Sequence, residues 1–147
     1  MPKTRSSYQP CPVARALDVV GDRWTMLIVR DAFDGISRFG DLQRNLGVAK
    51  NILADRLQKL VEAGILETRA ASDGSSYQEY VLTETGEQLF PVLVALRQWG
   101  EKERFAPSEA HSVLVDKQSG QPLLPMLPLA HDGSALQPSD TMVHKVA

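Results

Sequence analysis

The strongest constraint on the fold is a pair of short amphipathic segments separated by only three residues. Residues 38–46 place three apolar side chains on one helical face, and residues 50–63 repeat that spacing with five. The linker Gly47-Val48-Ala49 begins with glycine, which ends the first helix and permits a tight turn. Two helices joined so closely are typical of a helix-turn-helix. The side chains expected to face inward are Phe39, Leu42, Leu46, Ile52, Leu53, Leu57, Leu60 and Val61.

A hairpin signal follows directly. Residues 65–71 and 77–82 are short extended segments, and Ser72-Asp73-Gly74-Ser75-Ser76 between them contains the Asp-Gly pair common in hairpin turns. A hairpin placed behind a helix-turn-helix is the wing of a winged helix.

Two helices are expected ahead of this unit. Apolar spacing predicts a first helix over residues 13–20, with Pro12 in its first turn, where a missing N–H is tolerated. Residues 24–33 are apolar on nearly every side, which predicts a helix at the centre of the domain with Asp22 as its N-cap. Ser37 is the expected cap of the third helix.

A long helix is expected after the hairpin. Thr83 is its predicted N-cap, and it runs from Glu84 to about Arg104 with a kink at Pro91, because an internal proline removes a backbone hydrogen bond. It carries more large apolar residues than a terminal helix of a small monomer easily buries, so a partner subunit is the natural cover. These residues are Phe90, Leu93, Leu96 and Trp99.

The predicted fold class is therefore mainly α with a small β-hairpin (α+β), a winged helix-turn-helix with a long C-terminal dimerisation helix. We expect a flexible N-terminal arm over residues 1–10 and a DNA-binding and dimerisation domain over residues 11–104. A C-terminal extension over residues 105–147 follows. Its residues 113–117 and 121–127 flank Ser119-Gly120 and favour an extra C-terminal hairpin, and its end is expected to be a loose or partner-dependent tail.

The second helix of the helix-turn-helix carries side chains suited to DNA. Lys50 and Asn51 in its first turn, and Asp55 and Arg56 one turn later, are expected at base edges, since lysine or arginine pairs with guanine and asparagine with adenine. Other residues are expected at phosphates or, from the wing, along the backbone or minor groove. These are Arg38, Arg44, Lys59, Arg69, Ser72, Ser75 and Ser76. For any of these charges alone, a solvated helix face is the simpler interpretation.

Overall charge argues weakly against nucleic acid, because the chain carries a formal net charge of −2 and a pI near 5.9. The two halves differ, however. Residues 1–69 hold 11 Lys and Arg against 8 Asp and Glu, a net of +3, whereas residues 70–147 hold 5 against 10, a net of −5. The positive charge lies in the half that contains the predicted reading helix.

Cys11 is the single cysteine, so the chain has no intrachain disulfide or cysteine-rich zinc site, and the isolated thiol fits a reducing compartment. At the start of the first helix, the helix dipole and Arg15 favour the thiolate. Two interpretations stay open. Cys11 is either inert packing or a redox-sensing candidate whose product is a bond to Cys11 of a second chain or an adduct.

Neither a metal nor a cofactor is expected. The three histidines fall in the tail without metal-ligand spacing and are expected at the solvated surface; they are His111, His131 and His144. A small-molecule pocket between the long helices is one interpretation of the aromatic residues, and plain core is the other; these residues are Trp24, Phe33, Phe90 and Trp99. We find no signal peptide or membrane-spanning pattern and expect a cytoplasmic protein.

Six segments occur in a fixed order that matches a known family. They are Cys11-Pro12-Val13-Ala14-Arg15-Ala16-Leu17, Gly21-Asp22-Arg23-Trp24-Thr25, Arg38-Phe39-Gly40-Asp41-Leu42, Leu53-Ala54-Asp55-Arg56-Leu57, Leu82-Thr83-Glu84-Thr85-Gly86 and Trp99-Gly100. Over residues 11–104 the chain resembles the HxlR family of bacterial regulators, relatives of the MarR group.

This resemblance implies a dimeric winged-helix protein whose first and last helices form the subunit interface and whose fourth helix reads a palindromic operator. It also implies a redox or electrophile sensor as one role for Cys11, since the family includes sensors with a cysteine at this position. Two departures stand out. Ala49 replaces the helix-capping serine of many relatives, and the tail from Phe105 exceeds the family's minimal form.

We therefore expect a transcriptional regulator that binds double-stranded DNA as a homodimer on an inverted-repeat operator, with a small molecule or an oxidant as candidate effector. An enzyme is disfavoured, because the chain lacks a glycine-rich phosphate loop, HExxH, CxxC and a nucleophile elbow. The alternative is a winged helix that serves only as a protein-protein interaction module, which the acidic overall charge would suit.

Overall fold

The computed structural model describes residues 10–146, so all of the expected N-terminal arm except Pro10 lies outside the described residues. The chain divides into two compact units, Met1–Phe90 and Pro91–Ala147. Each unit is a separate body with its own local contacts, and the first contains the helix-turn-helix and the hairpin.

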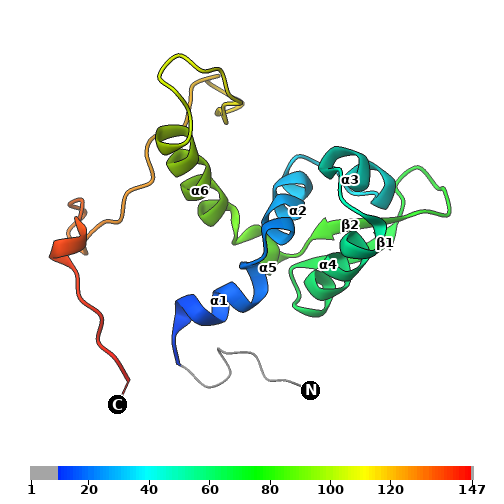
Figure 1. Ribbon diagram of the computed structural model, residues 1–147, viewed down its shortest axis with the longest axis horizontal. Helices are drawn as coiled ribbons and strands as arrows, with labels where there is room; N and C mark the ends of the chain where they lie inside the picture. The colour runs from blue at the N-terminus through cyan, green and yellow to red at the C-terminus, as the bar shows by residue number, and fades with distance from the viewer. Residues whose placement is uncertain (1–9, 147) are drawn as a thin grey trace. The chain divides into compact units, whose positions relative to one another are not determined.

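The first unit has the element order of a winged helix (Figure 1). Four helices come first, then an antiparallel hairpin and a one-turn helix, which confirms the α+β fold class expected from the sequence. The helices are α1 (Pro12–Val20), α2 (Arg23–Phe33), α3 (Phe39–Leu46), α4 (Lys50–Glu62) and α5 (Glu84–Glu87), and the strands are β1 (Leu66–Ala70) and β2 (Gln78–Leu82).

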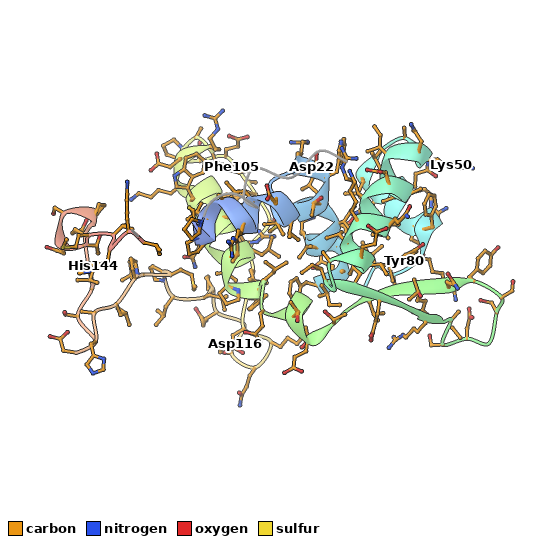
Figure 2. The ribbon with its side chains drawn as sticks, turned by 90° about the horizontal axis from the view of Figure 1, so that it is seen from below. Asp22, Lys50, Tyr80, Phe105, Asp116 and His144 are labelled. Carbon is orange, nitrogen blue, oxygen red and sulfur yellow. The ribbon has the colours of Figure 1, made fainter. Side chains whose placement is uncertain are left out.

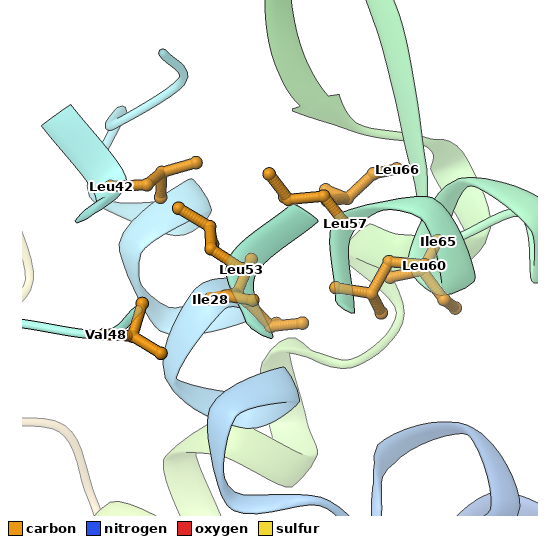
Figure 3. Close-up of a cluster of buried hydrophobic side chains, with 9 residues drawn as sticks. Ile28, Leu42, Val48, Leu53, Leu57, Leu60, Ile65 and Leu66 are labelled. Carbon is orange, nitrogen blue, oxygen red and sulfur yellow. The ribbon is translucent and has the colours of Figure 1, made fainter. Parts of the chain in front are cut away.

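The core of this unit lies between α2, α3, α4 and the base of the hairpin (Figure 3). Leu53, Leu57 and Leu60 recur at helical spacing along α4, and each is almost completely buried. Val48 from the turn and Leu66 from β1 complete the cluster with Ile28, Val29, Leu42 and Ile65. The inward face of α4 is thus the one predicted from periodicity, which leaves its other face polar.

Helix caps confirm three of the four expected start signals. The Cys11 sulfur and the Asp22 carboxylate cap α1 and α2, and the Thr83 hydroxyl accepts a bond from the Gly86 amide at the start of α5. The prediction for Ser37 is wrong, because Arg38 occupies the N-cap position of α3 without a side-chain cap. The Ser37 hydroxyl instead donates to Glu79 at 2.9 Å, a partner 42 residues away that local sequence signals do not reveal.

The hairpin pairs Leu66 with Leu82 at its base and Ala70 with Gln78 near its tip. Its turn contains Gly74 in the left-handed region at φ 79°, as an Asp-Gly turn requires. The Tyr80 amide also donates to the Ser37 carbonyl at 2.8 Å, so the short segment before α3 lies beside β2. The wing is therefore fixed to the helix-turn-helix by a backbone hydrogen bond as well as by side-chain hydrogen bonds.

The predicted long helix with a kink at Pro91 is two helices, α5 and α6 (Phe90–Glu103). The chain turns at Gln88 and Leu89, so Pro91 falls in the first turn of a new helix, where its missing N–H is tolerated. Gly86 is required in α5, since a Cβ there would lie 2.2 Å from the Ile65 carbonyl oxygen. A proline that we expected to bend a helix instead lies in the first turn of one.

The second unit contains α6 and a segment with little regular structure. Val115 and Pro122 form a single antiparallel bridge around the Ser119-Gly120 turn, so the expected extra hairpin is reduced to one pair. A second bridge joins Leu129 and Ala135, and η2 (Pro138–Asp140) is a single 3-10 turn. Prolines at 122, 125 and 128 limit longer pairing, because proline has no N–H to donate to a ladder.

Candidate nucleic-acid interface

The turn between α3 and α4 is held by bonds that cross it. Gly47 ends α3 in the left-handed conformation at φ 66°, and its amide donates to the Gln43 carbonyl at 2.8 Å. The Gln43 side-chain amide then donates to the Val48 carbonyl at 3.3 Å, and the Val48 side chain is buried. These contacts fix the direction in which α4 leaves the turn.

The first turn of α4 is open. Ala49 occupies its N-cap position and makes no side-chain cap bond, as expected from the sequence. The N-cap side chain therefore does not cap the first N–H groups of this helix. Lys50 and Asn51 are exposed, and Figure 2 shows Lys50 at the beginning of this helix. Lys50 has no ion pair within residues 10–146. A helix start of this kind favours an anionic ligand.

The next turn of α4 carries a chain of charges that bind one another. The Asp55 carboxylate accepts from Arg56 at 2.6 Å and lies 3.2 Å from the Lys59 ammonium. Lys59, followed by Arg56, holds the pKa of Asp55 below its ordinary value. The charges predicted for DNA contact at 55, 56 and 59 are therefore together, but they are balanced by each other.

Arg56 also reaches across to α2. Its Nε donates to one Asp22 carboxylate oxygen at 2.9 Å and its Nη2 to the other at 3.3 Å, and only 26% of its side chain is exposed. The same carboxylate caps α2 by accepting from the Trp24 and Thr25 amides at 3.0 and 3.2 Å. Arg56, foremost among these partners, lowers the pKa of Asp22. Arg56 was expected at a base edge, whereas in the structure it joins α4 to the start of α2.

Arg38 binds the tip of the wing. Its guanidinium donates to the Asp73 carboxylate at 2.5 Å and lies 5.5 Å from the Tyr77 ring centroid, within the range of a cation–π contact. The Ser75 amide and then Arg38 lower the pKa of Asp73 well below its ordinary range. A groove of about 610 Å³ runs between α3 and β2 here, and its lining includes Arg38, Arg44 and Tyr77.

Tyr77 is an interface candidate that the sequence analysis missed. Its side chain is 65% exposed on the wing, although an apolar ring of that size is normally covered. An aromatic residue three positions after the Asp-Gly pair is the only sequence signal that would have pointed to it. Ser72 and Ser76 are also exposed on the wing, whereas Ser75 is partly covered.

Glu79 fixes the wing from inside. Its buried carboxylate accepts from the Ser72 amide at 2.6 Å and from the Ser37 hydroxyl at 2.9 Å, and Arg69 lies 4.0 Å away. The Ser72 bond, followed by the Ser37 bond, lowers the pKa of Glu79. Two of the predicted wing residues, Ser72 and Arg69, thus share one carboxylate.

Arg44 pairs with Asp41 on the exposed face of α3. With this pair, five of the predicted cationic contacts lie beside a carboxylate: Arg38, Arg44, Arg56, Lys59 and Arg69. The face is polar and ordered, and its positive charge is largely compensated within the protein. This compensation explains how a chain with an acidic pI can present many basic side chains.

Cys11 lies at the N-cap of α1, where sequence analysis placed it. Its sulfur accepts a 3.4 Å bond from the Ala14 amide, and the residue is partly exposed. The α1 helix has no buried residue, and Val13 and Leu17 are more than half exposed.

The other candidate sites of the sequence analysis have plain structural surroundings. Phe33 packs against Phe90 with centroids 5.3 Å apart, and both line a cavity of about 620 Å³ whose rim carries Glu67, Glu87 and Arg69. Trp24 packs against the core. His111 contacts Phe105 and lies 3.6 Å from Glu101, and, like His131 and His144, it is exposed as expected.

Residues 10–146 contain no candidate metal centre and no candidate membrane-spanning helix. No three His, Cys, Asp or Glu side chains in that part of the chain gather as metal ligands would. Likewise, none of the helices described is both long enough and apolar enough to cross a membrane.

Comparison with known proteins places this geometry in context. A profile of the HxlR-like helix-turn-helix family matches residues 19–107. The uncharacterized HTH-type transcriptional regulator Rv3095 of Mycobacterium tuberculosis is 41% identical over 124 residues, which cover 84% of this chain and 78% of that protein.

Two solved structures share the fold. The crystal structure of PA1607, described as a candidate transcription factor, is 55% identical, has a TM-score of 0.91 and covers 96% of this chain and 99% of its own. The redox regulator HypR in its oxidized form is 31% identical with a TM-score of 0.59, and its whole chain covers 65% of this one. The chain is thus a bacterial-type winged-helix transcriptional regulator that belongs to the HxlR-like helix-turn-helix family.

Proposed function

We propose that the chain binds double-stranded DNA as a homodimer and controls transcription from an inverted-repeat operator. The observation that carries this proposal is the open start of α4. Lys50 and Asn51 are exposed there, directly after the α3–α4 turn that the Gln43 hydrogen bond holds. A helix presented in this way fits the major groove, which is about 12 Å wide. Two reading helices related by a two-fold axis would then lie about 34–36 Å apart.

The contacts divide into two classes. Lys50 and Asn51 read base edges, and Asp55 lies one turn further along the same helix. Arg38, Arg44, Lys59 and Arg69 contact phosphates, with Ser72, Ser75, Ser76 and Tyr77 along the wing. Arg56 acts differently from the sequence expectation, since its bonds to Asp22 use the donors that guanine would need, and it orients α4.

Exposed apolar side chains on two helices support the homodimer. On α1, Val13 and Leu17 are more than half exposed, and on α6, Leu96 and Trp99 are exposed to a similar degree. A soluble monomer rarely exposes so many large apolar groups, so a second copy is the natural cover for the first and last helices. We infer a cytoplasmic protein without enzymatic activity, since transcription takes place there in bacteria and the fold serves regulators.

Cys11 is the proposed sensor, and an oxidant is the proposed effector. HypR is a redox regulator of the same fold, and Cys11 lies partly exposed on the helix assigned to the dimer interface. Oxidation would join two Cys11 sulfurs, and the two thiols would lose two protons and two electrons to an oxidant such as diamide. Diamide should release the parent protein from DNA and leave Cys11→Ser bound; equal release of both proteins would remove this role.

A protein-protein interaction module is the second candidate function, because carboxylates already neutralise most cations on this face. Selection of bound sequences from random duplex DNA separates the two functions. DNA binding predicts recovery of an inverted repeat with half-sites about one helical turn apart. Recovery of no common sequence, with no retention of any duplex, would favour the interaction module.

A further inference from the structure

Most of residues 105–146, here the C-terminal arm, are exposed. Among the described residues of the second unit, 91–146, Val94 is the single buried one. A unit of this length normally needs a core of its own or an external surface to cover its apolar side chains. The contacts within this unit therefore leave most large apolar side chains of the arm uncovered.

The two ends of the arm are held differently. Residues 112–126 bond to α6, where the Gln98 side chain donates to the Leu124 carbonyl at 3.0 Å and accepts from the Met126 amide at 2.7 Å. Among the described residues, the hydrogen bonds of 127–146 stay within that stretch, as in the Ala130 amide to Ser134 carbonyl bond at 2.7 Å. The arm is thus anchored at its start and extends beyond the helix.

The arm is apolar, and its prolines restrict it. Leu124 is 86% exposed, Met142 and Val143 are each 78% exposed, and Leu127, Leu129 and Val146 are more than half exposed. Pro122, Pro125, Pro128 and Pro138 restrict the backbone, which lowers the entropy lost when such a segment lies down on a surface.

The exposed area matches a dimer. Besides Phe105, nine large apolar side chains of the arm are exposed, at about 100 Å² each, so one arm offers roughly 900 Å². Two arms and the surface that they cover on the partner chains would bury roughly 3,600 Å², and obligate homodimer interfaces bury about 2,000–5,000 Å² in total. The nine are Val113, Val115, Leu124, Met126, Leu127, Leu129, Met142, Val143 and Val146.

Charge and comparison both separate the arm from the DNA-reading fold. The arm holds two lysines against four acidic residues, a net of −2, so its charge disfavours DNA as the partner. The family profile ends at residue 107, and HypR covers only 65% of this chain, but PA1607 covers 96% of it. The arm is an addition that some relatives share, not part of the minimal fold.

We infer that the C-terminal arm lies on the winged-helix half of a second copy of this chain, so that two arms are exchanged in the dimer. This inference rests on the proposed homodimer and adds a contact surface to α1 and α6. The arm then strengthens dimerisation, and relatives that lack the arm would depend on α1 and α6 alone.

The test combines isotope labelling with a dimer equilibrium, both on the full chain. Unlabelled and ¹⁵N-labelled protein are mixed until subunits exchange and are treated with an amine-reactive cross-linker, after which peptides linking Lys117 or Lys145 to residues 1–69 are analysed by mass spectrometry. Arm exchange predicts that these linked peptides contain mixed labels. Links found only between peptides of one label would place the arm on its own chain and overturn the inference.

Analytical ultracentrifugation tests the inference even if no pair of lysines lies close enough for the cross-linker. Met142→Ser with Val143→Ser should raise the dimer dissociation constant by about tenfold or more, because both side chains lose an apolar contact. His144→Ser, the matched exposed polar change next to them, should leave it unchanged. An unaltered constant in the double variant overturns the arm inference and leaves the dimer intact, whereas a monomeric parent protein overturns both.

Discussion

Replacing Asp22 with asparagine separates the two contacts that this side chain makes. Asparagine still accepts the Trp24 and Thr25 amide bonds that cap α2, but it loses the charge that attracts Arg56. Alanine at the same position removes both. The difference between the two variants therefore isolates the cap, and the difference between asparagine and the parent isolates the ion pair.

The magnitudes follow from the geometry. The pair is only partly shielded, with 38% of the Asp22 side chain and 26% of the Arg56 side chain exposed. Exposed pairs contribute about 0.2–1 kcal/mol, and the two-point Arg56 contact places this one near the upper end. Loss of the cap adds about 1 kcal/mol. Asp22→Asn should thus lower the free energy of unfolding by about 1 kcal/mol, and Asp22→Ala by about 2 kcal/mol.

A double-mutant cycle in urea, at protein concentrations where the oligomeric state is constant, measures the coupling. In an Arg56→Ala background the Asp22→Asn change should be nearly neutral, because the asparagine no longer loses a partner. Equal losses in both backgrounds would refute the reasoning. Arg56 would then be free in solution, and its original assignment to a base edge would be restored.

Three further predictions concern the reading helix and the wing. Asn51→Ala should weaken binding to the operator by about 1–3 kcal/mol relative to random duplex, whereas Lys59→Ala should weaken binding to operator and random duplex alike. Fluorescence anisotropy measures both affinities. Equal losses of operator and random-duplex binding in Asn51→Ala would remove the base-reading role of Asn51. Asp73→Asn should tighten binding to random duplex, because Arg38 loses its internal partner; weaker binding would mean that the pair orients the wing instead. The lowered pKa of Glu79 contributes stability that is present above its ordinary value of 4.5 and lost as pH falls below it. Glu79→Gln should therefore flatten the acid side of a thermal-stability profile against pH, and a profile parallel to that of the parent would contradict this.

Local sequence patterns predicted most of the fold. The spacing of Leu53, Leu57 and Leu60 determined the buried face of α4, and Gly47 and Gly74 marked turns that need a left-handed residue. Asp22 and Thr83 were recognisable as caps because a cap acts within three residues. Each of these signals is read within one or two turns of chain.

The features that the sequence did not reveal are contacts between distant segments. Arg56 and Asp22 are 34 residues apart, and Ser37 and Glu79 are 42 apart, so no local pattern distinguishes these pairs from solvated charges. The close approach of Gly86 in α5 to Ile65 is also a tertiary contact. The composition of the candidate interface was predictable, but its internal neutralisation was not.

Salt dependence of DNA binding tests the central claim most directly. If Arg38, Arg44, Lys59 and Arg69 of each subunit meet phosphates, a dimer neutralises up to about eight, and the slope of log K against log salt would approach roughly −7. Because all four of these cations must first leave a carboxylate, we predict a slope between about −4 and −7 for the operator duplex. A response that stays flat between about 50 and 200 mM salt would contradict DNA recognition by this face.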